Sequence, residues 1–280
     1  MTDPQEPKPP AGPPMEPAAA PADLPTAGVP EPGQAPEGLP EPAAVVPQPE
    51  RYPFWSYLDL AALAGMALPM LLVASLITLF LLHSIQWGPR IRALGPIAAT
   101  FAFYGFWFLV LFALIRLRYG RPFWRSLRWV RSQPGVLACV LYGLLTAAVC
   151  VLLGVVLHPP EIKTPLEQLL QDSASVVLMG VFAVTLGPLC EELAFRGFLQ
   201  PLLTRTFGAV GGVLLQAVPF TLLHGFEYAW SWQRLLIIFF AGASFGWMRH
   251  TSGSTANATY MHSAYNLTFF AGLLAQRYAR

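Results

Sequence analysis

After residue 50, apolar residues fall in blocks close to the length of about 20 residues that an α-helix needs to cross a bilayer. Short polar or basic segments separate the blocks, so the pattern predicts an all-α, polytopic bundle of about seven transmembrane helices. The predicted spans lie near residues 57–83, 93–115, 135–157, 174–198, 211–226, 233–249 and 254–275. The fifth span is short and contains Pro219, which favours a broken or partly re-entrant helix that is buried in protein or faces a water-filled cavity.

The first 50 residues differ in composition from the rest of the chain. They hold 16 of the 28 prolines, eight acidic residues against one lysine, and no aromatic residue. Such a segment cannot bury a core, so we expect a disordered, partly polyproline tail. Three parts follow: this tail over 1–50, N-terminal transmembrane helices with an arginine-rich loop over 51–157, and a transmembrane domain with the candidate chemistry over 158–280.

A run of arginines between the second and third predicted spans sets the expected orientation. That loop contains no acidic residue, whereas segment 158–173 carries Glu161, Glu167 and Asp172. Because loops rich in Lys and Arg stay on the cytoplasmic side, the arginine-rich loop and the N-terminus are predicted to be cytoplasmic and segment 158–173 external. We expect a multi-pass integral protein of the plasma (inner) membrane, in contact with lipid and without a nucleic-acid partner. The loop arginines are Arg116, Arg118, Arg121, Arg125, Arg128 and Arg131.

Ionisable residues are scarce inside the predicted spans, and most of them gather in three short motifs on the fourth, fifth and seventh spans. Charged groups are costly in hydrocarbon, so a cluster of them at membrane depth is a functional-site hypothesis by default. Polar groups there contribute little net stability, which argues against a purely structural role for three converging clusters. The motifs are Glu191-Glu192-Leu-Ala-Phe195-Arg196-Gly197, Phe220-Thr-Leu-Leu-His224 and His262-Ser-Ala-Tyr-Asn266.

Helical spacing assigns different directions to the two glutamates. Glu192 and Arg196 are four residues apart and are predicted to pair on one helix face. Glu191 points about 100° away and is free to face the centre of the bundle. If the fourth span ends near residue 200, Glu191 lies roughly 13 Å below that surface, and His262 lies at about 12 Å by the same rise per residue. His224 reaches this depth only if the fifth span starts near residue 213 or is kinked.

The three motifs, in this order and with these spacings, resemble those of the CAAX-protease and bacteriocin-processing (CPBP) family, which includes the Ras-converting enzyme. The resemblance covers roughly residues 160–275, so the first three spans and the tail lie outside it. It implies an intramembrane endopeptidase that hydrolyses a peptide bond of a prenylated, CAAX-type protein or of a membrane-associated peptide.

The resemblance also implies roles for individual residues. Glu191 is similar to the glutamate that activates the attacking water, and His224 to the histidine that helps to position this water. His262 and Asn266 resemble the donors that stabilise the tetrahedral oxyanion. The residues similar to those that shape the site are Glu192, Arg196 and Phe220.

Two alternatives stay open from the sequence. Glu191, His224 and His262 are the ligand types of a catalytic zinc, so a metalloprotease mechanism is one alternative. The chain lacks an H-E-x-x-H helix, and we therefore favour water activation without a metal or another cofactor. The second alternative is a non-enzymatic binding or immunity protein that uses the same pocket to hold a peptide.

Overall fold

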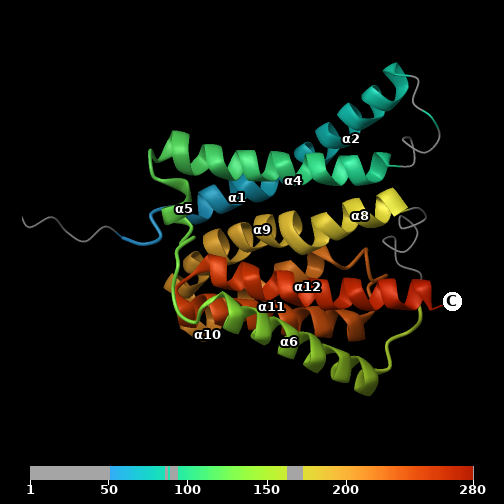
Figure 1. Cartoon of the computed structure of the whole chain (residues 1–280). Coiled ribbons are helices and arrows are strands. Elements are labelled where there is room, and N and C mark those ends of the chain that lie inside the picture. The colour runs from blue at the N-terminus through green and yellow to red at the C-terminus, as the bar shows by residue number, and fades with distance from the viewer. Residues whose placement is uncertain (1–50, 86–87, 89–93, 163–172, 280) are drawn as a thin grey trace, which may run out of the picture. The chain divides into compact units, whose positions relative to one another are not determined.

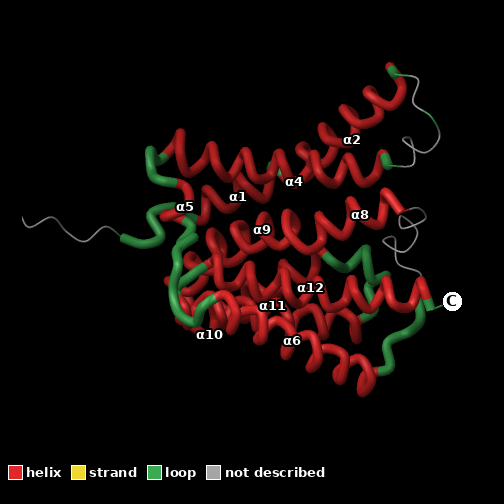
Figure 2. The backbone as a smooth tube through the Cα atoms, in the orientation of Figure 1, coloured by secondary structure: helices red, strands yellow, loops and turns green. Residues whose placement is uncertain are grey.

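The computed structural model describes residues 51–85, 88, 94–162 and 173–279. Throughout these residues the regular secondary structure is helical, without a strand (Figure 2). The predicted all-α fold is confirmed. The tail predicted over residues 1–50 lies outside the described residues. The same holds for Glu167 and Asp172 of the predicted external segment.

Helices occupy the first three predicted spans. The first comprises α1 (Tyr57–Gly65) and α2 (Ala67–Ser84), the second comprises α4 (Gly95–Ala113) and the π-helical turn η1 (Leu114–Arg118), and the third is α6 (Val136–Leu157). A short helix, α5 (Phe123–Ser126), lies in the arginine-rich loop. α6 ends at His158, because the prolines that follow cannot continue a helix.

The fourth and fifth predicted spans form one helical stretch that reverses at Gly208. Its elements are α8 (Ser173–Val181), η2 (Phe182–Leu186), α9 (Gly187–Glu192), η3 (Leu193–Leu199) and α10 (Gln200–Leu223). Gly208 has φ 74° and ψ 179°, a backbone conformation that is open almost exclusively to glycine. The predicted end near residue 198 was therefore wrong. The expected break near Pro219 was wrong too, because α10 continues through this proline.

The two limbs on either side of Gly208 lie against the same helix, α11 (Trp232–Ser252). Gln200 Nε2 donates to the Gly246 carbonyl at 2.9 Å, and Gln216 Nε2 donates to the Gly242 carbonyl, one turn away, at 3.0 Å. The chain thus forms a tight helical hairpin, and the second limb returns toward the depth of Glu191.

Within the described residues, four stretches are long and apolar enough to cross a membrane: Tyr57–Ser84, Gly95–Arg118, Val136–Leu157 and Ser173–Leu223. They indicate a multi-pass membrane protein. α11 and α12 (Thr255–Tyr278) occupy the sixth and seventh predicted spans but are not among the four, so their crossing of the membrane stays a prediction.

Close helix packing brings the motif-bearing helices together. α12 packs along α6 and also contacts α9, while α10 packs along α11 (Figure 1). α6 and α12 approach each other closely at Gly143 of α6, where an added Cβ would overlap the Met261 carbonyl oxygen and lie 2.8 Å from Ala264 Cβ of α12. Small residues at such crossings let helix backbones approach each other within a membrane.

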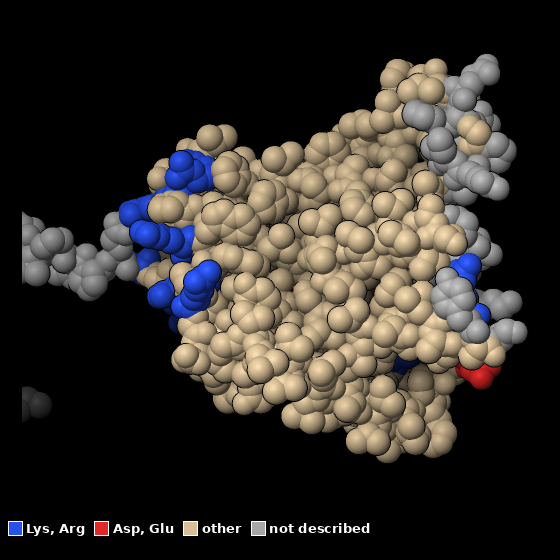
Figure 3. Space-filling model, viewed as in Figure 1, with Lys and Arg blue, Asp and Glu red and all other residues tan. Residues whose placement is uncertain are grey.

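Positive charge gathers at the end of the bundle where α5 lies. Figure 3 shows Lys and Arg side chains at this end, beside a broad surface almost without charge. Several connections meet there: Arg205 Nη1 donates to the Pro53 carbonyl at 2.8 Å, and the Thr255 amide donates to the Arg128 carbonyl at 2.9 Å. The segment before α1, the loop after η1, and the α11–α12 turn therefore share one end, as the predicted alternation of spans requires.

Candidate active site

Glu192, Arg196 and His262 form a fully connected polar group in the core of the bundle. Arg196 Nη1 donates to Glu192 Oε1 at 2.8 Å, and both side chains are fully buried. His262 Nδ1 lies 2.9 Å from the same oxygen. The predicted pairing of Glu192 with Arg196 is observed, and Glu192 in addition joins the fourth predicted span to the seventh.

Both terminal nitrogens of Arg196 and the face of its guanidinium group have partners in the protein. Its Nη2 donates to the Gly242 carbonyl at 2.7 Å, and its guanidinium carbon lies 4.4 Å from the centre of the Phe220 ring. A cation over an aromatic face is attracted by the ring quadrupole, more strongly where water is excluded. Phe220 therefore shapes the site by covering the charged pair.

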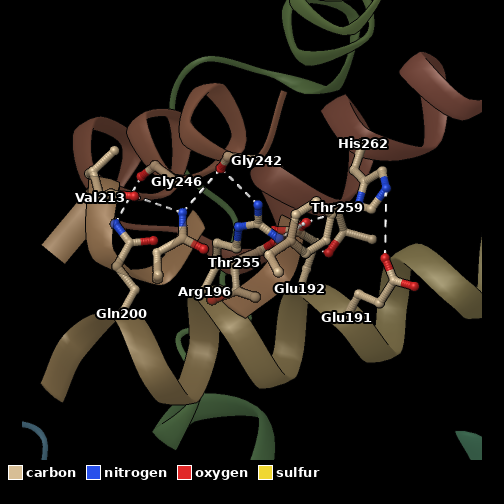
Figure 4. Close-up of polar contacts among 12 residues, drawn as sticks. Glu191, Glu192, Arg196, Gln200, Val213, Gly242, Gly246, Thr255, Thr259 and His262 are labelled. Atoms are coloured by element: carbon tan, nitrogen blue, oxygen red, sulfur yellow. Dashed lines mark hydrogen bonds and ion pairs between the residues drawn. The ribbon is translucent and has the colours of Figure 1, made fainter. Parts of the chain in front are cut away.

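Glu192 also fixes the chemical state of the His262 ring. A carboxylate oxygen only accepts, so Nδ1 of His262 must carry the proton that it shares with Glu192. The other ring nitrogen, Nε2, then faces Glu191, and Figure 4 shows the His262 ring between the two carboxylates. The distance from Nε2 to Glu191 Oε2 is 3.9 Å, which is too long for a hydrogen bond.

Glu191 takes a different set of neighbours from Glu192. It is partly exposed, and its Oε1 accepts a hydrogen bond of 2.6 Å from the Tyr104 hydroxyl of α4. Its Oε2 faces His262. As the helical spacing predicted, Glu191 points away from Arg196, and it faces His262.

Two π-helical turns, η2 and η3, flank the glutamate pair. Such turns widen a helix and occur frequently at functional sites. The Ala183 carbonyl of η2 accepts a hydrogen bond of 2.8 Å from Asn266 Nδ2. This contact orients the Asn266 amide and leaves its second N–H available to another acceptor.

His224 lies at the end of the second limb of the hairpin. Glu191 is 17 residues before Gly208 and His224 is 16 residues after it, so the reversal brings both residues to a similar level. The late start near residue 213 or the kink within the fifth span that the sequence required is not observed, because the second limb runs as a helix from the reversal at Gly208 to Leu223. His224 Nδ1 lies 2.8 Å from the Phe220 carbonyl and must donate to it, which leaves Nε2 as an acceptor. The Phe220 ring packs against both the His224 and the His262 rings.

Several polar residues around the site were not singled out from the sequence. Tyr104 lies in a helix without a motif, and Glu227 follows His224 by three residues in the turn that ends the hairpin. The charge of Glu227 acts on both His224 and Glu191. Gln200 (Figure 4) and Gln216 both donate to carbonyl groups of α11 and extend the buried polar group along this helix. Only Gln200 carried a signal, because it continues the four-residue spacing of Glu192 and Arg196.

The arrangement does not fit the metal-dependent alternative. Within the part of the chain that the structure describes, no three His, Cys, Asp or Glu side chains gather closely enough to hold a metal ion. The set of Glu191, His224 and His262 is therefore not assembled as a zinc site, and we derive no step through a metal.

Comparison with known protein families gives a match over residues 173–268, to the family model described as type II CAAX prenyl endopeptidase Rce1-like. The matched residues contain all three motifs and run from α8 into α12. α1 to α6, including Tyr104, lie outside the match. No curated protein and no solved structure gives a significant match.

Proposed function

We propose that the chain is an intramembrane endopeptidase in which Glu191 activates the attacking water. The proposal starts from the Rce1-like domain of the type II CAAX prenyl endopeptidases that the chain carries over residues 173–268. The observation that carries the proposal is that the two adjacent glutamates have different partners. Glu192 is paired with Arg196 and bonded to His262, whereas Glu191 directs Oε2 toward His262 without a hydrogen bond to it.

Water activation follows from the roles of Glu191 and His224. The carboxylate of Glu191 accepts a proton as the water oxygen attacks the peptide carbonyl carbon. His224 presents Nε2 as an acceptor, which suits it to hold the second hydrogen of the same water. The proton on Glu191 then passes to the leaving nitrogen as the C–N bond breaks, which yields a carboxylic acid and an amine; transfer of the acid proton to the amine gives the carboxylate and the ammonium group.

Oxyanion stabilisation falls to His262 and Asn266. Asn266 offers its second amide N–H, since the first is donated to Ala183. His262 can donate from Nε2 when its ring is an imidazolium, and the Glu192 carboxylate on Nδ1 stabilises that cation. Donors that are already oriented in a water-poor site contribute about 3–4 kcal/mol each to the stabilisation of the transition state.

The substrate class and the orientation are part of the same proposal. The family match supports a prenylated, CAAX-type protein as substrate, which would enter from the cytoplasmic side or from lipid. We place the arginine-rich end, with the N-terminus, in the cytoplasm, and the chain in the plasma (inner) membrane with α11 and α12 as its last two spans.

A cleavage assay on the full chain in lipid nanodiscs tests this function. The probe is an internally quenched, farnesylated peptide with a CAAX terminus, and its unprenylated counterpart tests the preference for the lipid. We expect Glu191→Gln to lower kcat by about 10²–10⁴-fold, the usual contribution of a general base. Glu161→Gln, the same change on an exposed carboxylate, is the control and should cleave like the wild type. Equal cleavage by Glu191→Gln would rule out Glu191 as the base, and binding of the peptide without cleavage by the wild type would favour the non-enzymatic alternative.

A further inference from the structure

The Tyr104 hydroxyl makes a hydrogen bond that reaches Glu191 from outside the matched domain. It donates to Glu191 Oε1 at 2.6 Å. A distance in this range is typical of an O–H group that donates to an ionised carboxylate, which is stronger than a hydrogen bond between neutral groups. Tyr104 belongs to α4, about 70 residues before the match begins.

Tyr104 is held rigidly in this position. Its ring packs edge-on against Phe182 of η2, with centroids 4.8 Å apart and planes at 90°, and against Phe103 at 5.6 Å. The Cys190 sulfur, beside Glu191, lies 4.0 Å from the Tyr104 carbonyl oxygen. Both the ring and the backbone of Tyr104 are therefore fixed relative to the helix that carries Glu191.

The position of Tyr104 along its helix places the contact with Glu191 at membrane depth. Tyr104 lies near the middle of the 24-residue stretch Gly95–Arg118, one of the four that are long enough to cross the membrane. A hydroxyl at that depth has no bulk water to bond with and needs a partner in the protein. Tyrosines at the ends of such a helix would instead reach the interface.

We propose that Tyr104 is a positioning residue of the reaction, and that it occupies Glu191 Oε1 so that Oε2 stays directed at the attacking water. This inference rests on the proposed function, since it assigns a role around the same base. Unlike Glu192, Glu191 has no cation bonded to it in its own helix, so its carboxylate plane needs an outside contact to fix it. On this reading the site is completed by α4, and the matched domain alone lacks a functional part.

Tyr104→Phe removes the donor and keeps the ring that packs on Phe182. With the full chain and the farnesylated CAAX peptide, we expect kcat to fall about 10- to 100-fold, because a base that is free to rotate is out of line with the water for most of the time. KM should stay within about twofold, since the hydroxyl does not touch the peptide. The matched control is Tyr142→Phe, which removes the same atom from an exposed tyrosine of α6 and should change neither constant.

An infrared measurement tests the contact without any turnover. The difference spectrum between the wild type and Glu191→Gln identifies the carboxylate bands of Glu191, and we expect Tyr104→Phe, but not Tyr142→Phe, to shift them. Unshifted bands, or a normal kcat in Tyr104→Phe, would overturn the proposal. If the wild type cleaves no peptide at all, the proposed function fails, and the infrared bands still decide whether Tyr104 holds Glu191.

Discussion

At the scale of single residues, Glu191 and Glu192 show how a helix separates two identical side chains. Glu192 lies on the face of Arg196 and accepts from both Arg196 and His262 through one oxygen. Glu191 lies about 100° around the helix, where Tyr104 and His262 are its neighbours. Glu192 is therefore engaged in the buried ion pair, and Glu191 remains available for chemistry.

The sequence predicted this separation, but not every partner. The four-residue spacing of Glu192 and Arg196 requires only helical geometry, which a sequence supplies directly. Tyr104 could not be found this way, because the contact depends on how α4 packs against α9 and no local pattern around Tyr104 marks it. The bond between Asn266 and the Ala183 carbonyl likewise depends on a π-helical turn that the sequence did not predict.

Arg196→Met is expected to destabilise the protein strongly. It removes the fully buried cation that neutralises Glu192, and the loss of one partner from a buried ion pair costs about 3–5 kcal/mol. Arg205→Met is the matched control, because Arg205 is only partly buried and donates to one carbonyl, so we expect a loss of about 0.5–1.5 kcal/mol. The free energy of unfolding in detergent measures both. If both variants lost the same free energy of unfolding, the buried ion pair would contribute no more to stability than the single hydrogen bond of Arg205.

At the scale of elements, the hairpin α8–α10 sets the geometry of the site. The sequence placed a loop between the fourth and fifth spans, whereas the structure continues the helix to Gly208 and reverses there. The pattern of apolar residues could not reveal this, because residues 199–210 are polar enough for a loop and also compatible with a helix. The sequence instead required a fifth span that starts near residue 213 or is kinked, and the structure shows neither, because α10 runs as a helix from Gly208 to Leu223.

Gly143→Ala tests the packing of α6 on α12. The added methyl group would meet the Met261 backbone, which cannot move aside as a flexible side chain could. Overpacking of this kind costs about 1–3 kcal/mol. Gly154→Ala in the same helix is the control, because the nearest neighbour of the added methyl group would be Ile237 Cδ1 at 3.9 Å. We expect the free energy of unfolding of this variant to equal that of the wild type or to exceed it by up to about 1 kcal/mol. A destabilisation of both variants to the same extent would contradict the packing described for Gly143.

At the scale of the whole molecule, charge and connectivity agree on a topology. The connections at 51–56, 116–131, around Arg205 and at the α11–α12 turn share the arginine-rich end, while Arg234 at the start of α11 reaches the Pro160 carbonyl beyond the end of α6. The hydropathy pattern predicted the alternation of the helices, because short polar or basic segments separate the apolar blocks. It does not identify by itself which end faces the cytoplasm.

Cysteine labelling determines the orientation. Cys139, Cys150 and Cys190 are first replaced by alanine, and single cysteines are then introduced at the exposed positions Arg131 and Glu161. We expect a membrane-impermeant maleimide to label Glu161→Cys in intact cells and Arg131→Cys only after permeabilisation. The reverse labelling would invert the proposed topology and move the arginine-rich end outside.

The central claim is that this chain hydrolyses peptide bonds and that Glu191 is the base. A survey of protein termini in cells that express the wild type or Glu191→Gln at equal levels tests it most directly. We predict new termini in cells with the wild type that are absent with Glu191→Gln, and their sequences would identify the substrate. Indistinguishable sets of termini, with both proteins folded in the membrane, would contradict the claim.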